Sequence, residues 1–297
     1  MLRLIETKIT NGVPVADYFD TIAGTSTGGI MAIGLGLKKP ATLIERLYSE
    51  HGSQVFPVYW TENRVRRFMR HVKRSLYDNA VLERLLYKTF GDQIVGDSYA
   101  RLVIPSFLGP ETQIAVLKTD HHPDFERDWK MAAWEAARAT SAAPTFFPGH
   151  GGEGYVFLDG GVWANNPIMA AVIDALSSYD VSRDQIEVLS IGTGNAPHDI
   201  SAFALYGGMF DWREIINGAM FLTTDNAQAQ ATLLLGPEKI LRLEPTGDAA
   251  RIELDDYRAA NELLPPLALA HFEANSGRVT DFFRSKVEPR HRFYTTP

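Results

Sequence analysis

Residues 24–29, with the sequence GTSTGG, fit the G-x-S-x-G pattern of a nucleophile elbow, and Ser26 stands at its centre. A short apolar run before the motif predicts a buried strand, and a predicted helix begins at Thr27. A serine at such a strand–turn–helix junction has an exposed hydroxyl that can attack a carbonyl carbon. We expect that a side chain at Gly24 or Gly28 would collide with the neighbouring strand and helix.

The predicted helix can assist the same chemistry. The N–H group of Thr27 and the positive end of the helix dipole can stabilise negative charge that develops on a substrate oxygen. The alternatives are a glycine-rich turn with a structural role only, or a loop that cradles phosphate. The lysine of a Walker loop is absent and G-x-G-x-x-G is not matched, so the strand–turn–helix context favours the catalytic interpretation.

Asp159 is the first candidate for the base that a serine nucleophile needs. It follows a predicted apolar strand and is followed by Gly160 and Gly161. A carboxylate in this place is partly removed from water, which raises its basicity, and it can accept the Ser26 proton directly if the two side chains meet. The alternative is that Asp159 only caps a turn through its own backbone. The residue pattern alone leaves both interpretations open.

A histidine is the commoner partner of a serine nucleophile, so the histidines form a second hypothesis. His198 follows the glycine turn at residues 192–194 and gives the chain order Ser26, Asp159, His198 that α/β-hydrolases share. This order is a weak argument, because it says nothing about distance. His121 and His122 stand in a polar stretch, and we expect them on the surface.

The composition of the chain excludes several classes of protein and several kinds of functional site. The chain has 297 residues, of which 45% are hydrophobic, enough for one large domain, and we expect a single domain over residues 1–297. The net charge of -7 argues against a nucleic-acid partner. The absence of cysteine excludes disulfides, zinc–thiolate sites and a cysteine nucleophile.

The apolar runs are too short to span a membrane, and the first residues lack the pattern of a signal peptide. We therefore expect a cytoplasmic protein, with the possibility of a peripheral place at a membrane. Residues 64–74 form a basic cluster that suits either a solvated helix face or anionic lipid headgroups.

Strands and helices alternate along the chain, which predicts an α/β fold with a mostly parallel sheet and helices on both faces. Glycine-bearing turns follow three predicted strands, at residues 24–26, 159–161 and 192–194. Because functional groups collect at the carboxyl ends of parallel strands, we expect these turns to build one site. The predicted strands are residues 18–23, 114–118, 155–158, 186–191 and 239–243. The predicted helices cover residues 27–37, 41–51, 129–140 and most of 203–283, and two more begin at Asn79, as a cap, and at Asn166-Pro167.

Residues 24–29 together with residues 159–161 resemble the motifs of the patatin-like phospholipases. Four further segments match that family in the same order, at residues 20–23, 140–148, 162–167 and 190–194. The resemblance covers about residues 17–194, and the C-terminal third matches only in being helical. It implies a three-layer α/β fold and a Ser–Asp dyad without a histidine, in which Ser26 is the nucleophile and Asp159 the base.

The same resemblance implies hydrolysis of fatty acyl esters of phospholipids, lysophospholipids or related lipids through an acyl-enzyme. It implies no cofactor and no metal, a lipid ester as the substrate, and transient contact with a membrane surface. Five apolar side chains are expected around the turns and favour esters of longer fatty acids: Met31, Phe107, Phe146, Phe147 and Trp163.

One feature of the family has no match here. Patatin-like phospholipases carry a glycine-rich loop of the D-G-G-G-x-R-G kind before the elbow, and its N–H groups form the oxyanion hole. No such loop stands before Ser26. The expectation is that the first strand and the loop either lie upstream of Met1 or are absent. The second case leaves an alternative function, a non-catalytic lipid-binding or inactive member of the family.

Overall fold

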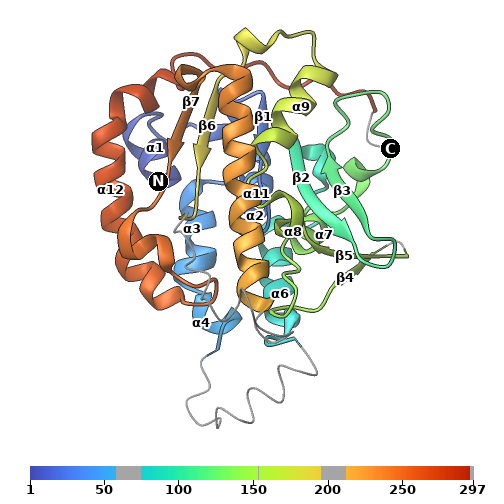
Figure 1. Cartoon of the computed structure of the whole chain (residues 1–297). Helices are drawn as coiled ribbons and strands as arrows, with labels where there is room; N and C mark the ends of the chain where they lie inside the picture. Colours follow the sequence, from blue (N-terminus) through green and yellow to red (C-terminus); the bar gives the residue numbers. More distant parts are fainter. Residues whose placement is uncertain (58–74, 153, 195–211, 295–297) are drawn as a thin grey trace.

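A mixed sheet lies between two layers of helices (Figure 1). The structure is a computed structural model that describes residues 1–57, 75–152, 154–194 and 212–294. The strands are β1 (Thr21–Ala23), β2 (Arg101–Leu108), β3 (Gln113–Lys118), β4 (His150–Gly152), β5 (Tyr155–Asp159), β6 (Val188–Ile191) and β7 (Ile240–Leu243). The α-helices are α1 (Leu2–Lys8), α2 (Thr27–Gly36), α3 (Ala41–Ser49), α4 (Gly52–Val55), α6 (Asn79–Phe90), α7 (Ala133–Thr140), α8 (Gly161–Ala164), α9 (Ile168–Ser178), α11 (Trp212–Leu235) and α12 (Tyr257–Asp281). Short 3-10 helices are η1 (Val15–Tyr18), η2 (Val95–Asp97), η3 (Asp128–Lys130), η4 (Arg183–Gln185), η5 (Pro237–Lys239) and η6 (Gly247–Arg251).

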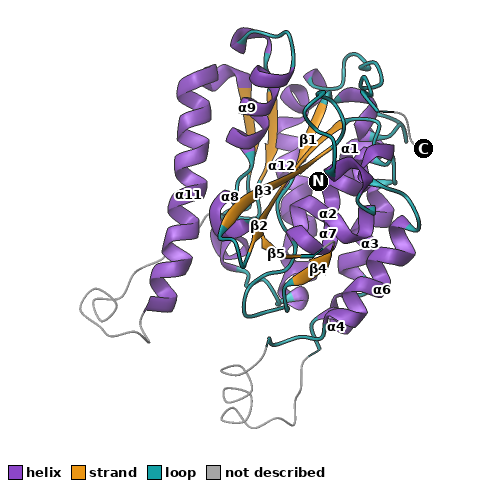
Figure 2. Cartoon of the chain, turned by 90° about the vertical axis from the view of Figure 1, so that its right-hand side faces the viewer, coloured by secondary structure: helices purple, strands orange, loops and turns teal. Residues whose placement is uncertain are grey.

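The helices divide between the two faces of the sheet. Helices α2 and α7 pack on one face of β1, β2 and β5, whereas α8 and α9 lie on the other face with α11 outside them (Figure 2). Buried apolar side chains such as Ile33, Leu102 and Ala136 fill the layer between α2, α7 and β2. The predicted three-layer α/β architecture is confirmed, and so is the helical C-terminal third where it is described.

The main sheet is mixed, which differs from the mostly parallel sheet that we predicted. In it β1 pairs parallel with β2, whereas β3 and β5 pair antiparallel with β2, and β4 pairs antiparallel with β5. Short connections are the physical reason. Four residues separate β2 from β3, and two separate β4 from β5, which is too short for the crossover that a parallel pair needs. Strands β6 and β7 form a separate parallel pair.

Two strands meet end to end along one edge of β2. Strand β1 pairs with residues 101–103 of β2 and β5 with residues 106–108, both on the edge opposite to β3. Because β1 runs parallel to β2 and β5 antiparallel, their carboxyl ends point toward each other. The segments that follow the two strands carry Ser26 and Asp159, so the topology brings these residues together.

Strand β2, which pairs with three other strands, was not predicted from the sequence. Pro105 interrupts its apolar run, and a proline argues against a central strand because it has no N–H to donate. Pro105 is tolerated here because it lies at the gap between the end of β1 and the end of β5. None of the strands in the described part of the chain needs an N–H group at this point of the edge.

Two predicted helix starts need correction. Helix α6 begins at Asn79, but its cap is Asp78, whose carboxylate accepts the N–H of Ala80 at 3.0 Å. Helix α9 begins after Pro167, and the Asn166 side chain accepts the N–H of Ile168 at 3.2 Å. In both cases a side chain one or two positions earlier satisfies a free N–H of the first turn. Within the described segments, no helix combines the length and the apolar character that crossing a bilayer requires.

Candidate active site

The Ser26 backbone has the strained geometry of a nucleophile elbow, with φ 57° and ψ -125°. The turn is tight because a Cβ atom at Gly24 would lie 2.0 Å from the Gly28 carbonyl oxygen. The expectation for Gly28 itself is wrong, since a Cβ atom there would meet nothing within 4 Å. The second position that needs glycine is Gly29, where a Cβ atom would lie 2.6 Å from the Thr140 methyl carbon.

The Ser26 and Asp159 side chains are hydrogen-bonded. Ser26 Oγ donates to Asp159 Oδ2 at 2.5 Å, and the N–H of Gly161 donates to the other carboxylate oxygen at 2.7 Å. Asp159 is 5% exposed. Gly160 is required for this packing, because a Cβ atom at that position would lie 2.3 Å from the Pro105 carbonyl oxygen. The carboxylate therefore has a fixed place and a direct path to the serine proton.

Burial raises the pKa of Asp159 to about 6, from an ordinary value of 3.8. The hydrogen bonds from Ser26 and from the Gly161 N–H lower the pKa, but by less than burial raises it. A carboxylate with a pKa near 6 is ionised at neutral pH and is still basic enough to take a proton from a nearby hydroxyl during a reaction.

The first turn of α2 lies directly behind Ser26. The N–H groups of Thr27 and Gly28 are the first two of this helix, and such groups have no partner inside the helix. The Thr27 carbonyl accepts a hydrogen bond from the Tyr48 hydroxyl at 3.1 Å, which ties the turn to α3. This end of the helix therefore offers backbone donors and a positive dipole beside the serine.

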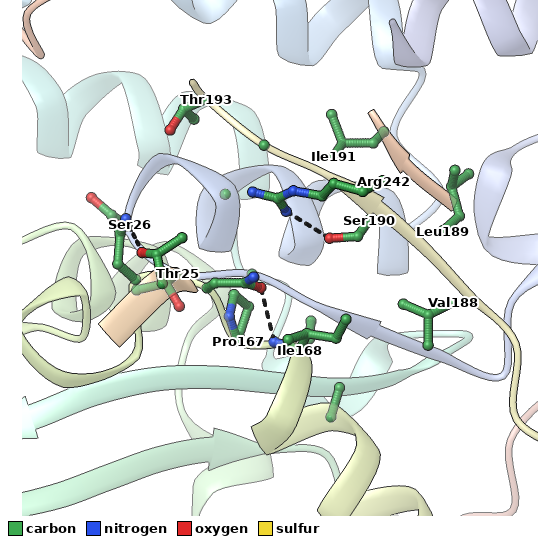
Figure 3. A pocket seen from close by; sticks show the side chains of 18 of the residues that line it. Thr25, Ser26, Pro167, Ile168, Val188, Leu189, Ser190, Ile191, Thr193 and Arg242 are labelled. Atoms are coloured by element: carbon green, nitrogen blue, oxygen red, sulfur yellow. Dashed lines mark hydrogen bonds between the residues drawn. The ribbon is translucent and has the colours of Figure 1, made fainter. Parts of the chain in front are cut away.

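Two cavities open on Ser26. The larger, about 1930 Å³, contains Ser26 and Asp159 and extends along β1 and β6. Figure 3 shows its β6 wall, where Arg242 donates to the Ser190 hydroxyl at 2.7 Å. The predicted turn at residues 192–194 lines the same cavity, so the three glycine turns do border one site.

The smaller cavity, about 140 Å³, is apolar and also begins at Ser26 and Thr27. Its walls come from α2, α3, α4, α6, the segment after α7 and the start of α12. The apolar side chains that line it include Ile30, Leu47, Val55, Phe56, Leu82, Leu85, Leu86 and Phe147. Of the five apolar residues expected around the turns, Phe147 lines this cavity and Phe146 the larger one, whereas Met31, Phe107 and Trp163 line neither.

A model of the family described as patatin-like phospholipase matches residues 7–172, which is more than half of the chain and includes Ser26 and Asp159. The chain belongs to the patatin-like phospholipase family. The resemblance seen in the motifs is thereby confirmed.

Individual members of this family are similar over most of the chain. A cGAMP-activated phospholipase from Pseudomonas aeruginosa is 33% identical over 70% of this chain and 64% of its own length. A cGAMP-activated phospholipase from Vibrio cholerae is 33% identical over 69% of this chain and 61% of its own. The human calcium-independent phospholipase A2-gamma is 28% identical over 86% of this chain and 34% of its own. The similarity therefore spans less than two thirds of each of these three relatives.

The histidines in the described segments line neither of the cavities that open on Ser26. His121 is buried rather than on the surface as expected, and its Nε2 lies 2.9 Å from the Asp174 carboxylate. His198 and the basic cluster at residues 64–74 lie outside the described residues.

Sequence reasoning missed two groups that touch the site. The Thr140 hydroxyl accepts the N–H of Ser26 at 3.1 Å, and the Ala142 carbonyl accepts the N–H of Asp159 at 3.1 Å. Thr140 was predicted as the last residue of a helix, and both residues lie in a segment noted for its match to the family. Nothing in the chemistry of a single threonine at the end of an alanine-rich helix indicates such a contact.

Proposed function

We propose that this protein hydrolyses fatty acyl esters of phospholipids or related lipids, with Ser26 as nucleophile and Asp159 as base. The observation that carries the proposal is the 2.5 Å hydrogen bond from Ser26 Oγ to a buried carboxylate, on a strained elbow at the head of a helix. Membership of the patatin-like phospholipase family and the names of the relatives support the lipid substrate.

The reaction would proceed in two halves. Ser26 Oγ attacks the ester carbonyl while Asp159 accepts its proton, and the Thr27 N–H and the α2 dipole stabilise the oxyanion. Asp159 then gives the proton to the departing alcohol, which leaves an acyl group on Ser26. In the second half Asp159 takes a proton from water, and the hydroxide attacks the acyl carbonyl of the acyl-enzyme. The bond between the acyl carbon and Ser26 Oγ then breaks while Asp159 returns the proton to Ser26 Oγ, which releases the fatty acid and restores the Ser26 hydroxyl.

The small apolar cavity beside Ser26 would hold the first part of the acyl chain. Each methylene that moves from water into such a cavity contributes about 0.8 kcal/mol. The two cavities share Ser26 and Thr27 but differ in most of their walls, so an acyl chain in the small cavity would leave the larger one for the alcohol part of the lipid. Because such substrates reside in bilayers, the protein would contact a membrane surface transiently.

The direct test is hydrolysis of phosphatidylcholine vesicles, followed by mass spectrometry of free fatty acid and lysolipid. The assay is run with and without cGAMP, because two bacterial relatives are named as activated by it. We expect release of fatty acid under at least one of the two conditions. Vesicle binding without release in both would support the alternative, a non-catalytic lipid-binding member of the family.

The rate should depend on pH through Asp159. The carboxylate acts as a base only when it is ionised, so kcat/KM should rise with pH, pass a midpoint at about 6 and reach a plateau. At pH 5 we expect a rate about tenfold below the plateau. The measurement is a pH series of p-nitrophenyl butyrate hydrolysis at constant ionic strength. A rate that stays flat from pH 5 to pH 8 contradicts Asp159 as the base.

Chain-length preference should depend on the small cavity. The unaltered protein should prefer longer acyl esters, by up to about fourfold in kcat/KM per buried methylene. Leu85→Trp should fill the cavity from α6 and lower kcat/KM for decanoyl esters by about tenfold, with a smaller effect on acetyl esters.

The matched control is Leu233→Trp on α11, because Leu233 is 87% exposed and does not line the cavity. This variant should leave the whole chain-length series unchanged. Equal losses for acetyl and decanoyl esters in Leu85→Trp would show that the cavity does not hold the acyl chain.

A further inference from the structure

We propose that Thr140 is a positioning residue, which sets the geometry of Ser26 and Asp159 by filling the gap between the facing ends of β1 and β5. This inference rests on the proposed function, because it assigns a role within the same hydrolysis. The Thr140 side chain bonds to the backbone of the nucleophile and lines neither cavity that opens on Ser26.

At Pro105, where neither β1 nor β5 pairs with β2, the Thr140 hydroxyl makes the hydrogen bonds that a paired strand would otherwise make. Its oxygen accepts the N–H of Ser26 at 3.1 Å and donates to the Pro105 carbonyl at 2.6 Å. Pro105 lies where β1 has ended and β5 has not yet begun, so no strand on that edge satisfies its carbonyl. Thr140 is fully buried, so water cannot take over either bond.

The direction of the hydroxyl is fixed by its partners. A threonine has one proton to donate, and the Pro105 carbonyl receives it. The lone pairs of the oxygen are then available to the Ser26 N–H, the one donor to this oxygen among the described residues. The methyl group of Thr140 packs against Gly29, which explains why the elbow needs glycine there. Both branches of the side chain therefore have a single orientation.

The same segment holds the base. The N–H of Asp159 donates to the Ala142 carbonyl at 3.1 Å, two residues after Thr140. The Ser141 hydroxyl donates to the Ala137 carbonyl at 2.8 Å, which fastens the segment to α7. The backbones of the nucleophile and of the base are thus both hydrogen-bonded to residues 140–142. The Thr140 hydroxyl makes the bond to the nucleophile. Without it, the strained Ser26 backbone has one restraint fewer.

The test compares three variants by hydrolysis and thermal unfolding. Thr140→Val keeps the shape and removes the hydroxyl, so kcat should fall at least about tenfold while KM changes little. Thr140→Ser keeps the hydroxyl and should retain most of kcat. Thr119→Val is the control, since Thr119 is equally buried and lines neither cavity at Ser26. Its hydroxyl likewise has two partners, the Leu102 N–H at 3.1 Å and His121 Nδ1 at 2.7 Å. This variant should lower the melting temperature comparably and leave kcat nearly unchanged.

The midpoint of the pH dependence of kcat/KM distinguishes a positioning role of Thr140 from a role in stability alone, which would leave that midpoint unchanged. Thr140→Val removes the partner of the Ser26 N–H and should displace Ser26, which weakens the bond from Ser26 Oγ to Asp159. Because that second bond lowers the pKa of Asp159, the midpoint of kcat/KM should shift to higher pH. Normal kcat in Thr140→Val, or a Thr140→Ser variant equally impaired, overturns the proposal. Should Thr140→Val fail to fold, Thr140→Ala removes the same hydroxyl and is judged by the same criteria. Failure of the proposed function itself looks different, because hydrolysis would then survive Ser26→Ala.

Discussion

Ser26→Ala and Asp159→Asn should each lower lipid ester hydrolysis by about 10⁴-fold or more, because one removes the nucleophile and the other its base. Within the described segments, Asp159 is the only side chain that hydrogen-bonds to Ser26 Oγ, so its replacement leaves the serine without its acid–base partner. The measurement is single-substrate kinetics on a soluble ester, with the fold of each variant checked by circular dichroism.

The stability of the Asp159→Asn variant provides a built-in control. The pKa of Asp159 is raised from 3.8 to about 6, so the folded protein favours the protonated form. Below pH 3.8 this carboxyl group is protonated in both the folded and the unfolded protein, and its contribution to the free energy of unfolding is fully present. That contribution is lost as the pH rises through about 6, because the buried group then has to ionise. At pH 7 the shift therefore costs about 3 kcal/mol. A neutral asparagine avoids this cost, so the variant should melt higher at pH 7 while it is inactive.

His198→Ala is the complementary control for the dyad. Because Asp159 is the one described side chain that hydrogen-bonds to the serine hydroxyl, this variant should keep most of the activity. A loss as large as that of Ser26→Ala would favour a Ser–His–Asp triad and contradict the dyad.

Gly24→Ala should abolish turnover almost as completely, through the backbone. The new Cβ atom would lie 2.0 Å from the Gly28 carbonyl oxygen and 2.4 Å from its carbon, so the elbow has to open. A displacement of the nucleophile by about 1 Å is enough to lower the rate by about 10²-fold. We expect at least that loss, together with a lower melting temperature and slow labelling of Ser26 by a fluorophosphonate.

Gly28→Ala is the matched comparison, two residues after the nucleophile. A Cβ atom there meets nothing within 4 Å, and an alanine favours the helix by about 0.5–1 kcal/mol over glycine. Its melting temperature should equal or exceed that of the unaltered protein, and Ser26 should still be labelled. Normal labelling of Gly24→Ala, or unfolding of Gly28→Ala, would contradict the packing of the elbow described above.

The elbow and the candidate base could be predicted because their signals are local. The glycine spacing around Ser26 and the Asp–Gly–Gly sequence at the end of β5 report the backbone that each turn needs. The choice between Asp159 as a base and Asp159 as a turn cap could not be made from the local sequence. It depends on which strand ends face each other, and that is a property of the whole sheet.

The unpredicted features arise from long-range pairing. Strand β2 was not predicted because Pro105 lies within it, and the sequence cannot show that neither β1 nor β5 pairs with β2 at that residue. Gly28 and Gly29 are adjacent in the motif, and the sequence does not show which of them has to be glycine. The close approach of the Thr140 side chain to Gly29 decides this. His121 looked polar and exposed, yet the distant Asp174 gives it a buried partner.

Peptide mass spectrometry after reaction with a fluorophosphonate tests the central claim most directly. We predict a single phosphonate adduct on the peptide that contains Ser26, formed with a rate that rises with pH through a midpoint of about 6. The adduct should be absent from Ser26→Ala and form far more slowly in Asp159→Asn. An adduct on another residue, or undiminished labelling of either variant, would contradict a Ser26–Asp159 dyad.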